Sequence, residues 1–221
     1  MGKIELDHTG SGSGITLSSD GTSLLLGGTA IGGGGSSFTS IVENYSNGTA
    51  PSVTGNDSVG IGDNVTVSAN DSYAIGHYAT CAGAMSIALG LQANVTSGAS
   101  QAVALGDNAT VNAGTSGVAL GTSYVSATDA FAAAIANNAS SYGATGANSI
   151  AMGINSKATA TGVAIGNAAQ ATTNYAYSIG FGSIASGNYS FAAGRDTTAS
   201  ARGTVALGEA SLANLQGKMS F

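Results

Sequence analysis

The residue types that most often carry catalytic or metal chemistry are sparse in this chain. It has two histidines, His8 and His77, and one cysteine, Cys81, which permits no internal disulfide. Without a Cys/His cluster, the sequence predicts no metal site. No Ser/His/Asp set stands in a distinctive motif, and the acidic pairs of glycan-cleaving enzymes are absent. We therefore expect no catalytic residues and no enzymatic activity.

Two short motifs suggest ligands at first sight. Residues 180–185 satisfy the G-x-G-x-x-A dinucleotide pattern, but they lack the strand-to-helix context that this pattern requires, so we expect no cofactor. Asp63 and Asp107 stand in Gly-Asp-Asn turns, where calcium could bind at a bend. Asx-turn hydrogen bonding is the commoner role of such aspartates, and it is the interpretation we prefer.

Composition indicates a β-rich, repetitive structural chain. Of the 221 residues 35 are glycine and one is proline, while 43% are hydrophobic and 7% are charged. Abundant Gly, Ser, Thr and Asn disfavour long helices, and the single proline excludes collagen. The net charge of −6 and the scattered Lys and Arg argue against nucleic acid as a partner. No apolar run is long enough to span a membrane, so we expect no membrane insertion.

The strongest signal is an internal repeat. A unit of large apolar, small, large apolar and glycine recurs eleven times at spacings of 13 to 17 residues, and its copy ending at Ala136 is degenerate. Small residues, such as Ala79 and Cys81, follow most anchors at three and five positions. Both signatures alternate with period two, which predicts two short strands per unit and a narrow β-solenoid. The anchor glycines are expected to have positive φ or a close backbone approach; they are Gly62, Gly76, Gly90, Gly106, Gly121, Gly153, Gly166, Gly180, Gly194 and Gly208.

Alternation also divides each first strand into two sides. Val103 and Leu105 must face one way and Ala104 the other. We expect the large residues inside the coil and the alanines on a flat outer face that a second chain can approach. A coil with so few large side chains is marginal alone, so we predict an obligate oligomer. The predicted core is Ile61, Ile75, Leu89, Leu105, Leu120, Ile135, Met152, Ile165, Ile179 and Leu207.

Residues 71–76, 153–160 and 161–171 resemble the head repeats of trimeric autotransporter adhesins of the YadA type. The resemblance covers about residues 58–221. It implies a left-handed parallel β-roll in which three chains pack side by side as a homotrimer. The degenerate copy at Ala136 and the longer step to Gly153 depart from the pattern, and we expect a loop or bulge between Ala139 and Asn148.

Residues 1–31 alternate in hydropathy between Gly-rich turns and are expected to form a short β segment. They resemble the opening segment of tail-fibre and other structural proteins of marine bacteriophages. The resemblance implies attachment to other virion or tail proteins, followed by a Gly/Ser-rich linker and entry segment over residues 32–57. Because the repeat register breaks off at Met219, Ser220 and Phe221, we expect more chain to follow.

The sequence thus favours a structural or adhesive phage fibre, located on the virion and serving as a spacer or as a contact to a host receptor. No export signal stands at the amino terminus, which favours assembly in a host cytoplasm. The alternative is a fragment of a bacterial autotransporter adhesin head at the cell surface. Exposed tyrosines off the core register suit sugar or protein contacts; they are Tyr78, Tyr124, Tyr142, Tyr175 and Tyr189.

A remote alternative is an ice-binding solenoid, which needs a regular ladder of threonines. The position four residues after each anchor should form such a ladder. It is broken, and reads Thr66, Thr80, Asn94, Thr110, Val125, Ser140, Lys157, Gln170, Ile184, Thr198 and Leu212. We therefore expect no ice binding.

Overall fold

The amino-terminal part of the chain forms a small antiparallel sheet. The computed structural model describes residues 4–6, 15–19, 24–26, 29–31, 48–133 and 141–221. Strands pair in the order β1-β2-β3-β4. Their bounds are β1 (Ile4–Leu6), β2 (Ile15–Ser19), β3 (Leu24–Leu26) and β4 (Thr29–Ile31). This sheet lies within residues 1–31, where the alternating pattern predicted strands.

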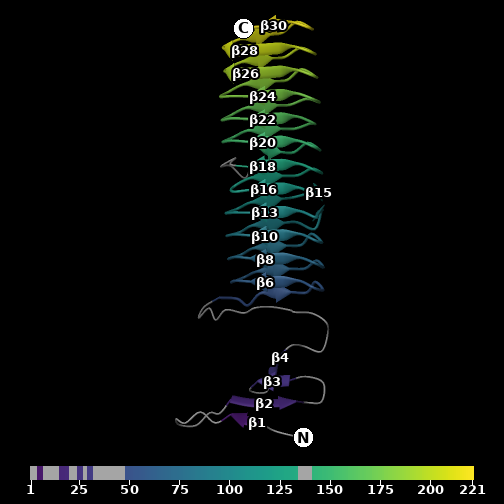
Figure 1. The fold of residues 1–221 in the computed structure, drawn as a ribbon, viewed down its shortest axis with the longest axis vertical. Helices are drawn as coiled ribbons and strands as arrows, with labels where there is room; N and C mark the ends of the chain where they lie inside the picture. Colours follow the sequence, from purple (N-terminus) through teal and green to yellow (C-terminus); the bar gives the residue numbers. More distant parts are fainter. Residues whose placement is uncertain (1–3, 7–14, 20–23, 27–28, 32–47, 134–140) are drawn as a thin grey trace.

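The rest of the described chain is a parallel β-solenoid of about twelve coils, stacked in sequence order in Figure 1. Within the described ranges the chain forms strands and turns and no helix. The first of the two long sheets comprises β6 (Val59–Ile61), β8 (Tyr73–Ile75), β10 (Ile87–Leu89), β13 (Val103–Leu105), β16 (Val118–Leu120), β18 (Phe131–Ala133), β20 (Ile150–Met152), β22 (Val163–Ile165), β24 (Tyr177–Ile179), β26 (Phe191–Arg195), β28 (Val205–Glu209) and β30 (Met219–Ser220).

The second long sheet is made of two-residue strands that alternate along the chain with those of the first sheet, beginning with β5 before β6. It comprises β5 (Ser52–Val53), β7 (Thr66–Val67), β9 (Thr80–Cys81), β11 (Asn94–Val95), β14 (Thr110–Val111), β17 (Tyr124–Val125), β19 (Gly143–Ala144), β21 (Lys157–Ala158), β23 (Gln170–Ala171), β25 (Ile184–Ala185), β27 (Thr198–Ala199) and β29 (Leu212–Ala213). The predicted two-strand coil is therefore confirmed, whereas the left-handed winding stays a prediction from the resemblance.

Equivalent repeat positions pair directly from one coil to the next. Leu105 pairs with Leu89 on one side and with Leu120 on the other, although the spacing between anchors differs. The extra residues lie in the turns. Two turns of successive coils pair with each other through β12 (Ala99–Ser100) and β15 (Gly114–Thr115). Register is fixed in this way because a slip by one residue would move every side chain to the opposite face.

Two predicted boundaries shift in the structure. Strand β5 pairs with β7, so the roll already begins within the linker predicted over residues 32–57. The loop expected between Ala139 and Asn148 lies partly outside the described residues. Its described part contains β19, which continues the second sheet by pairing with β17 and β21.

The interior of the roll is filled by small side chains, which reverses the predicted core. Ala74, in the middle of β8, has no exposed surface, while Ile75 beside it is 42% exposed. Of the predicted core residues, Ile75, Met152, Ile165 and Ile179 are exposed, and Ile61, Leu89, Leu105, Leu120 and Leu207 are half-buried. Ile135 lies outside the described residues.

The physical reason is the width of the coil. Two strands joined by tight turns leave room for about one methyl or isopropyl group from each side, and protein interiors tolerate little overpacking. The first sheet sends inward Ala74, Ala88, Ala104, Ala119, Ala132, Ala151, Ala164, Ser178, Ala192 and Ala206. The second sheet sends inward Val67, Cys81, Val95, Val111, Val125, Ala144, Ala158, Ala171, Ala185, Ala199 and Ala213. The second repeat signature predicted these small inward residues except Val125 and Ala144, which do not stand five residues after an anchor.

The anchor glycines behave as predicted. All ten of them have φ between +68° and +141°. At Gly90, a Cβ atom would lie 2.4 Å from the carbonyl oxygen of Gly106 in the next coil. Most anchors therefore combine a conformation that favours glycine with a backbone contact that leaves no room for a side chain.

Candidate functional site

The outward side of the first sheet is a long apolar surface, which we call the apolar face. Each described strand contributes its first and third residue, and none of these residues is charged. The first column is Val59, Tyr73, Ile87, Val103, Val118, Phe131, Ile150, Val163, Tyr177, Phe191, Val205 and Met219. The second column is Ile61, Ile75, Leu89, Leu105, Leu120, Ala133, Met152, Ile165, Ile179, Ala193 and Leu207.

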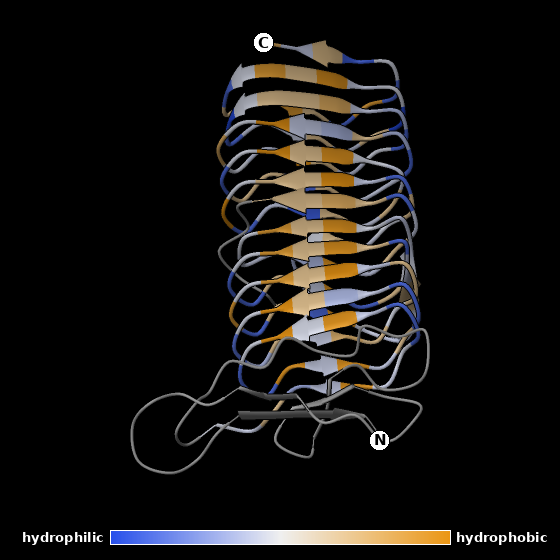
Figure 2. Cartoon of the chain, turned by 60° about the horizontal axis from the view of Figure 1, so that its bottom comes forward, coloured by the Kyte–Doolittle hydropathy of each residue, from blue (hydrophilic) through white to orange (hydrophobic). Residues whose placement is uncertain are grey.

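The apolar face is continuous because the register aligns like with like. Val103 pairs with Val118 and Leu105 with Leu120, so each column is an unbroken ladder of apolar side chains. Figure 2 shows the hydrophobic colouring repeated from coil to coil along this sheet. Several members are exposed despite their size, among them Tyr177 at 45% and Ile179 at 40%. Surfaces of this kind and extent mark interaction sites in soluble proteins.

Sequence reasoning found these residues but placed them on the wrong side of the strand. The signal that identifies the inside was present, because the second position of every first-sheet strand in the roll is Ala, Gly or Ser. Only that position is uniformly small, as the narrow coil requires.

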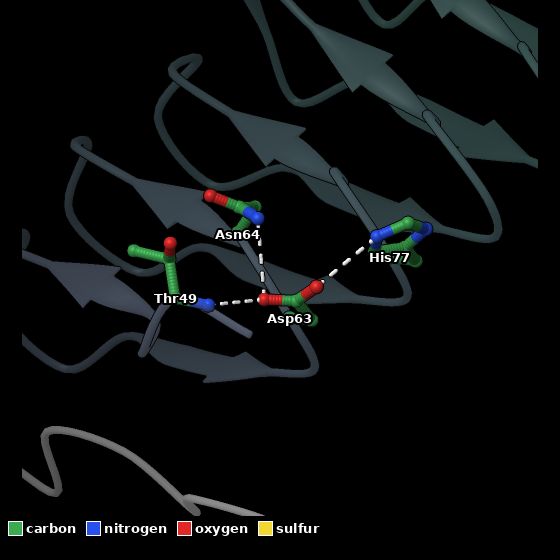
Figure 3. A network of polar contacts seen from close by, with 4 residues as sticks. All are labelled: Thr49, Asp63, Asn64 and His77. Carbon is green, nitrogen blue, oxygen red and sulfur yellow. Dashed lines mark hydrogen bonds and ion pairs between the residues drawn. The ribbon is translucent and has the colours of Figure 1, made fainter. Parts of the chain in front are cut away.

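At the first turn of the coil, Asp63 joins successive coils in the network of Figure 3. Its carboxylate accepts a hydrogen bond from the backbone N–H of Thr49 and another from the Asn64 side chain. The other oxygen lies 3.1 Å from Nε2 of His77. The Asp63 carboxylate thus connects β-roll coils fourteen residues apart, a role beyond the Asx turn that the sequence predicted.

Asp107 and residues 180–185 are the other motifs that suggested ligands at first sight. Asp107 is exposed and accepts a hydrogen bond of 2.8 Å from Asn108. Within the described ranges, no group of three or more His, Cys, Asp or Glu side chains is placed to hold a metal ion. Residues 180–185 form a turn and strand β25 and do not lead into a helix, so the dinucleotide context is missing.

Cys81 fills an interior position that valine or alanine occupies in other coils. It lies in β9 with no exposed surface, and its thiol is 3.8 Å from the carbonyl oxygen of Gly83. Burial raises the pKa of the Cys81 thiol above its ordinary value of 9.0.

This pKa shift predicts how the stability of the roll depends on pH. The folded state disfavours the Cys81 thiolate. The contribution of the protonated thiol to the stability of the roll should therefore be complete below the pKa of the unfolded chain, and it should be lost as the pH rises from about 9 through the folded pKa. The free energy of unfolding should decline by up to about 1.4 kcal/mol per pH unit in that window. Urea denaturation between pH 7 and 10.5 measures it. Cys81→Ala should lose this part of the slope, and an unchanged slope would contradict the prediction.

The outward side of the second sheet differs from the column predicted for ice binding. Strand β17 pairs Tyr124, not Val125, with Thr110, and Val125 is buried. Ser140 lies outside the described residues. Tyr124, Lys157, Ile184 and Leu212 interrupt the threonines of this outward column. The ladder is therefore irregular in three dimensions as well as in sequence.

Comparison with known protein families gives a match over part of the chain. The YadA head domain repeat matches residues 82–109, 144–163, 174–197 and 185–211. No curated protein matches the chain. In the part of the chain that the structure describes, no helix has the length and apolar character of a bilayer span. The matched segments all lie in the stacked coils, so over those segments the β-solenoid is similar to YadA head domain repeats.

Proposed function

We propose that the protein is a homotrimeric adhesive rod in which the apolar faces of three chains pack against one another. The observation that carries this proposal is the apolar face itself. It exposes large side chains along the roll, while the interior of each coil holds only small ones. Burying these side chains between chains would contribute about 25 cal/mol for each Å² of apolar surface removed from water.

The number of chains follows from the family resemblance. In YadA-type heads three rolls lie side by side, and three single-sided apolar surfaces can close around a common axis. Closed symmetry leaves the polar turns and the second sheet facing solvent. This arrangement gives the rod a buried centre and an outer surface available for contacts.

The trimer predicts a specific response to charge on the apolar face. The purified chain should sediment at three times its 21.1 kDa mass. Introducing Ile75→Asp with Leu89→Asp should weaken association by at least about tenfold, because each trimer would then bury six carboxylates. Analytical ultracentrifugation over a dilution series measures this.

The matched control carries the same charges on the second sheet of the same coils. Thr80→Asp with Asn94→Asp should leave the trimer intact, because these outward positions belong to the polar second sheet. A wild-type chain that sediments as a folded monomer at micromolar concentration would overturn the trimer. If both double variants dissociated equally, the apolar face would not be the interface of the trimer.

For the setting of the rod we propose a phage fibre, with residues 1–31 attaching it to the virion. This is supported by the resemblance of that segment to phage tail-fibre openings and by its antiparallel sheet, which differs in topology from the roll. The second candidate, the head of a bacterial surface adhesin, is favoured by the family match. In both settings the rod would act as a spacer or as a receptor contact.

Immunogold electron microscopy separates the two settings. Antibody against the roll should label an appendage on purified virions if the fibre assignment is right. If intact bacteria in uninfected culture were labelled and virions were not, the phage setting would be wrong and the rod would belong to the bacterial cell surface.

A further inference from the structure

Each coil has a first turn, which follows the anchor glycine, and a second turn, which leads from the second sheet back to the first. The second turns of three successive coils bring two tyrosines and an arginine into one row. The rings of Tyr175 and Tyr189 are stacked, with centroids 5.1 Å apart and planes inclined by 11°. The Arg202 guanidinium lies 5.6 Å from the centroid of the Tyr189 ring. Tyr175 is 48% exposed and Tyr189 is 56% exposed. The row is therefore an ordered aromatic and cationic surface that the core does not use.

The tyrosines occupy backbone positions that suit them poorly. Tyr175 has φ of +56° and Tyr189 has φ of +59°. In most coils a short residue or glycine holds this left-handed position, as Asp71, Asn148 and Gly203 do. A bulky residue there costs about 1–2 kcal/mol. Strained residues that are exposed and contribute nothing to the core are typical of binding sites.

Arg202 has no carboxylate partner within the part of the chain that the structure describes. Among the described residues the ion pairs are His77–Asp63 and those of Arg195 with Asp196 and Glu209, which lie at first turns or at the adjoining ends of β26 and β28. The second turns over residues 172–176, 186–190 and 200–204 contain no Asp or Glu. Asn174 and Asn188, both exposed, directly precede the two tyrosines in the chain. The row thus offers one unpaired guanidinium, two phenol hydroxyls and two carboxamides to an approaching ligand.

We propose that Tyr175, Tyr189 and Arg202 bind a carboxylate-bearing sugar of an acidic polysaccharide. A guanidinium matches a planar carboxylate with two parallel hydrogen bonds, and stacking on Tyr189 holds it in one orientation. Tyrosine supplies rigid contact area at low entropic cost, and asparagine supplies adaptable hydrogen bonds to sugar hydroxyls. One such row per chain would let an assembled trimer bind a repeating polymer several times over.

Binding of the full chain to polygalacturonate tests the proposal, with fully methyl-esterified pectin and dextran sulfate as comparison polymers. Polygalacturonate should bind, and its ester, which keeps the sugars but lacks the charge, should bind about tenfold more weakly or not at all. Arg202→Gln should weaken polygalacturonate binding about tenfold. Tyr189→Asn should weaken it similarly without lowering thermal stability, because asparagine tolerates positive φ.

Two matched variants separate this site from general charge attraction. Lys218→Gln removes the same charge from the next coil, and Tyr78→Asn removes a tyrosine with φ of +58° from a first turn. Both should bind polygalacturonate as the wild type does. Absence of polygalacturonate binding, equal loss from Arg202→Gln and Lys218→Gln, or a loss of dextran sulfate binding in Arg202→Gln as large as its loss of polygalacturonate binding would overturn the proposal.

This inference rests on the adhesive role proposed above, but the two fail in different measurements. A chain that sediments as a trimer but does not bind polygalacturonate would overturn the proposed binding site, and the proposed trimeric rod would stand. A chain that binds polygalacturonate through Arg202 but sediments as a monomer would overturn the trimer and leave the site.

Discussion

Replacing Ala171 with leucine is expected to destabilise the roll by about 3 kcal/mol. Ala171 points into the coil with no exposed surface, between Ala158 and Ala185 of the neighbouring coils. A methyl group placed on Gly162 would already lie 3.1 Å from the Ala171 Cβ atom, so the interior has no space for an isobutyl group. The strands must move apart, and the ladders on both sides should weaken.

The matched control is Gln170→Leu, one residue earlier in β23 and on its outward side. It adds a side chain of the same kind outside the coil and should change stability by no more than about 0.5 kcal/mol. Thermal unfolding followed by circular dichroism should show a midpoint roughly 6–12 °C lower for Ala171→Leu. Equal midpoints for the two variants would mean that the interior is wider than the buried alanines indicate.

The sequence was sufficient to predict the strands, their parallel stacking and the pairing of equivalent positions. Each of these follows from a repeat that alternates with period two, because equivalent residues of stacked coils must pair. The strand order of both long sheets agrees with that expectation. What alternation cannot give is which of the two sides faces inward, and there the prediction was wrong.

The reversal has a physical origin. Large apolar residues such as Leu105 were assigned to the core because hydrophobicity alone does not distinguish a core from an interface between chains. The distinguishing property is size variation, since Val, Tyr, Phe and Met alternate freely in the first outward column while Ala104 and its equivalents stay small. A narrow interior restricts size, and an exterior face does not.

The binding row proposed at the second turns was only half accessible to sequence reasoning. Tyr175 and Tyr189 fall off the core register, so their exposure was predicted and is confirmed. Arg202 comes thirteen residues after Tyr189, and its guanidinium lies near the Tyr189 ring only because the coil returns to the same turn. The absence of nearby carboxylates also depends on where the chain places Asp196 and Glu209.

The second large effect is expected at an anchor glycine. Gly180→Ala should break the contact between two coils, because the new Cβ would lie 2.1 Å from the carbonyl oxygen of Gly194. The φ of +124° is also a conformation that alanine rarely adopts. Together these effects should destabilise the roll by about 3 kcal/mol or more.

Because each coil contacts only its neighbours, the damage from Gly180→Ala should be local. Amide exchange should accelerate in β24 and β26 while β8 and β10 keep their protection. The control is Gly121→Asn, where φ is +68° and no heavy atom lies within 4 Å of an added Cβ. Asparagine tolerates that conformation, so the free energy of unfolding of this variant should lie within about 1 kcal/mol of the wild-type value. An equal loss of unfolding free energy in Gly180→Ala and Gly121→Asn would contradict this explanation. The close carbonyl contact between coils would then not be the reason for glycine at Gly180, and the positive φ shared by the anchors would be.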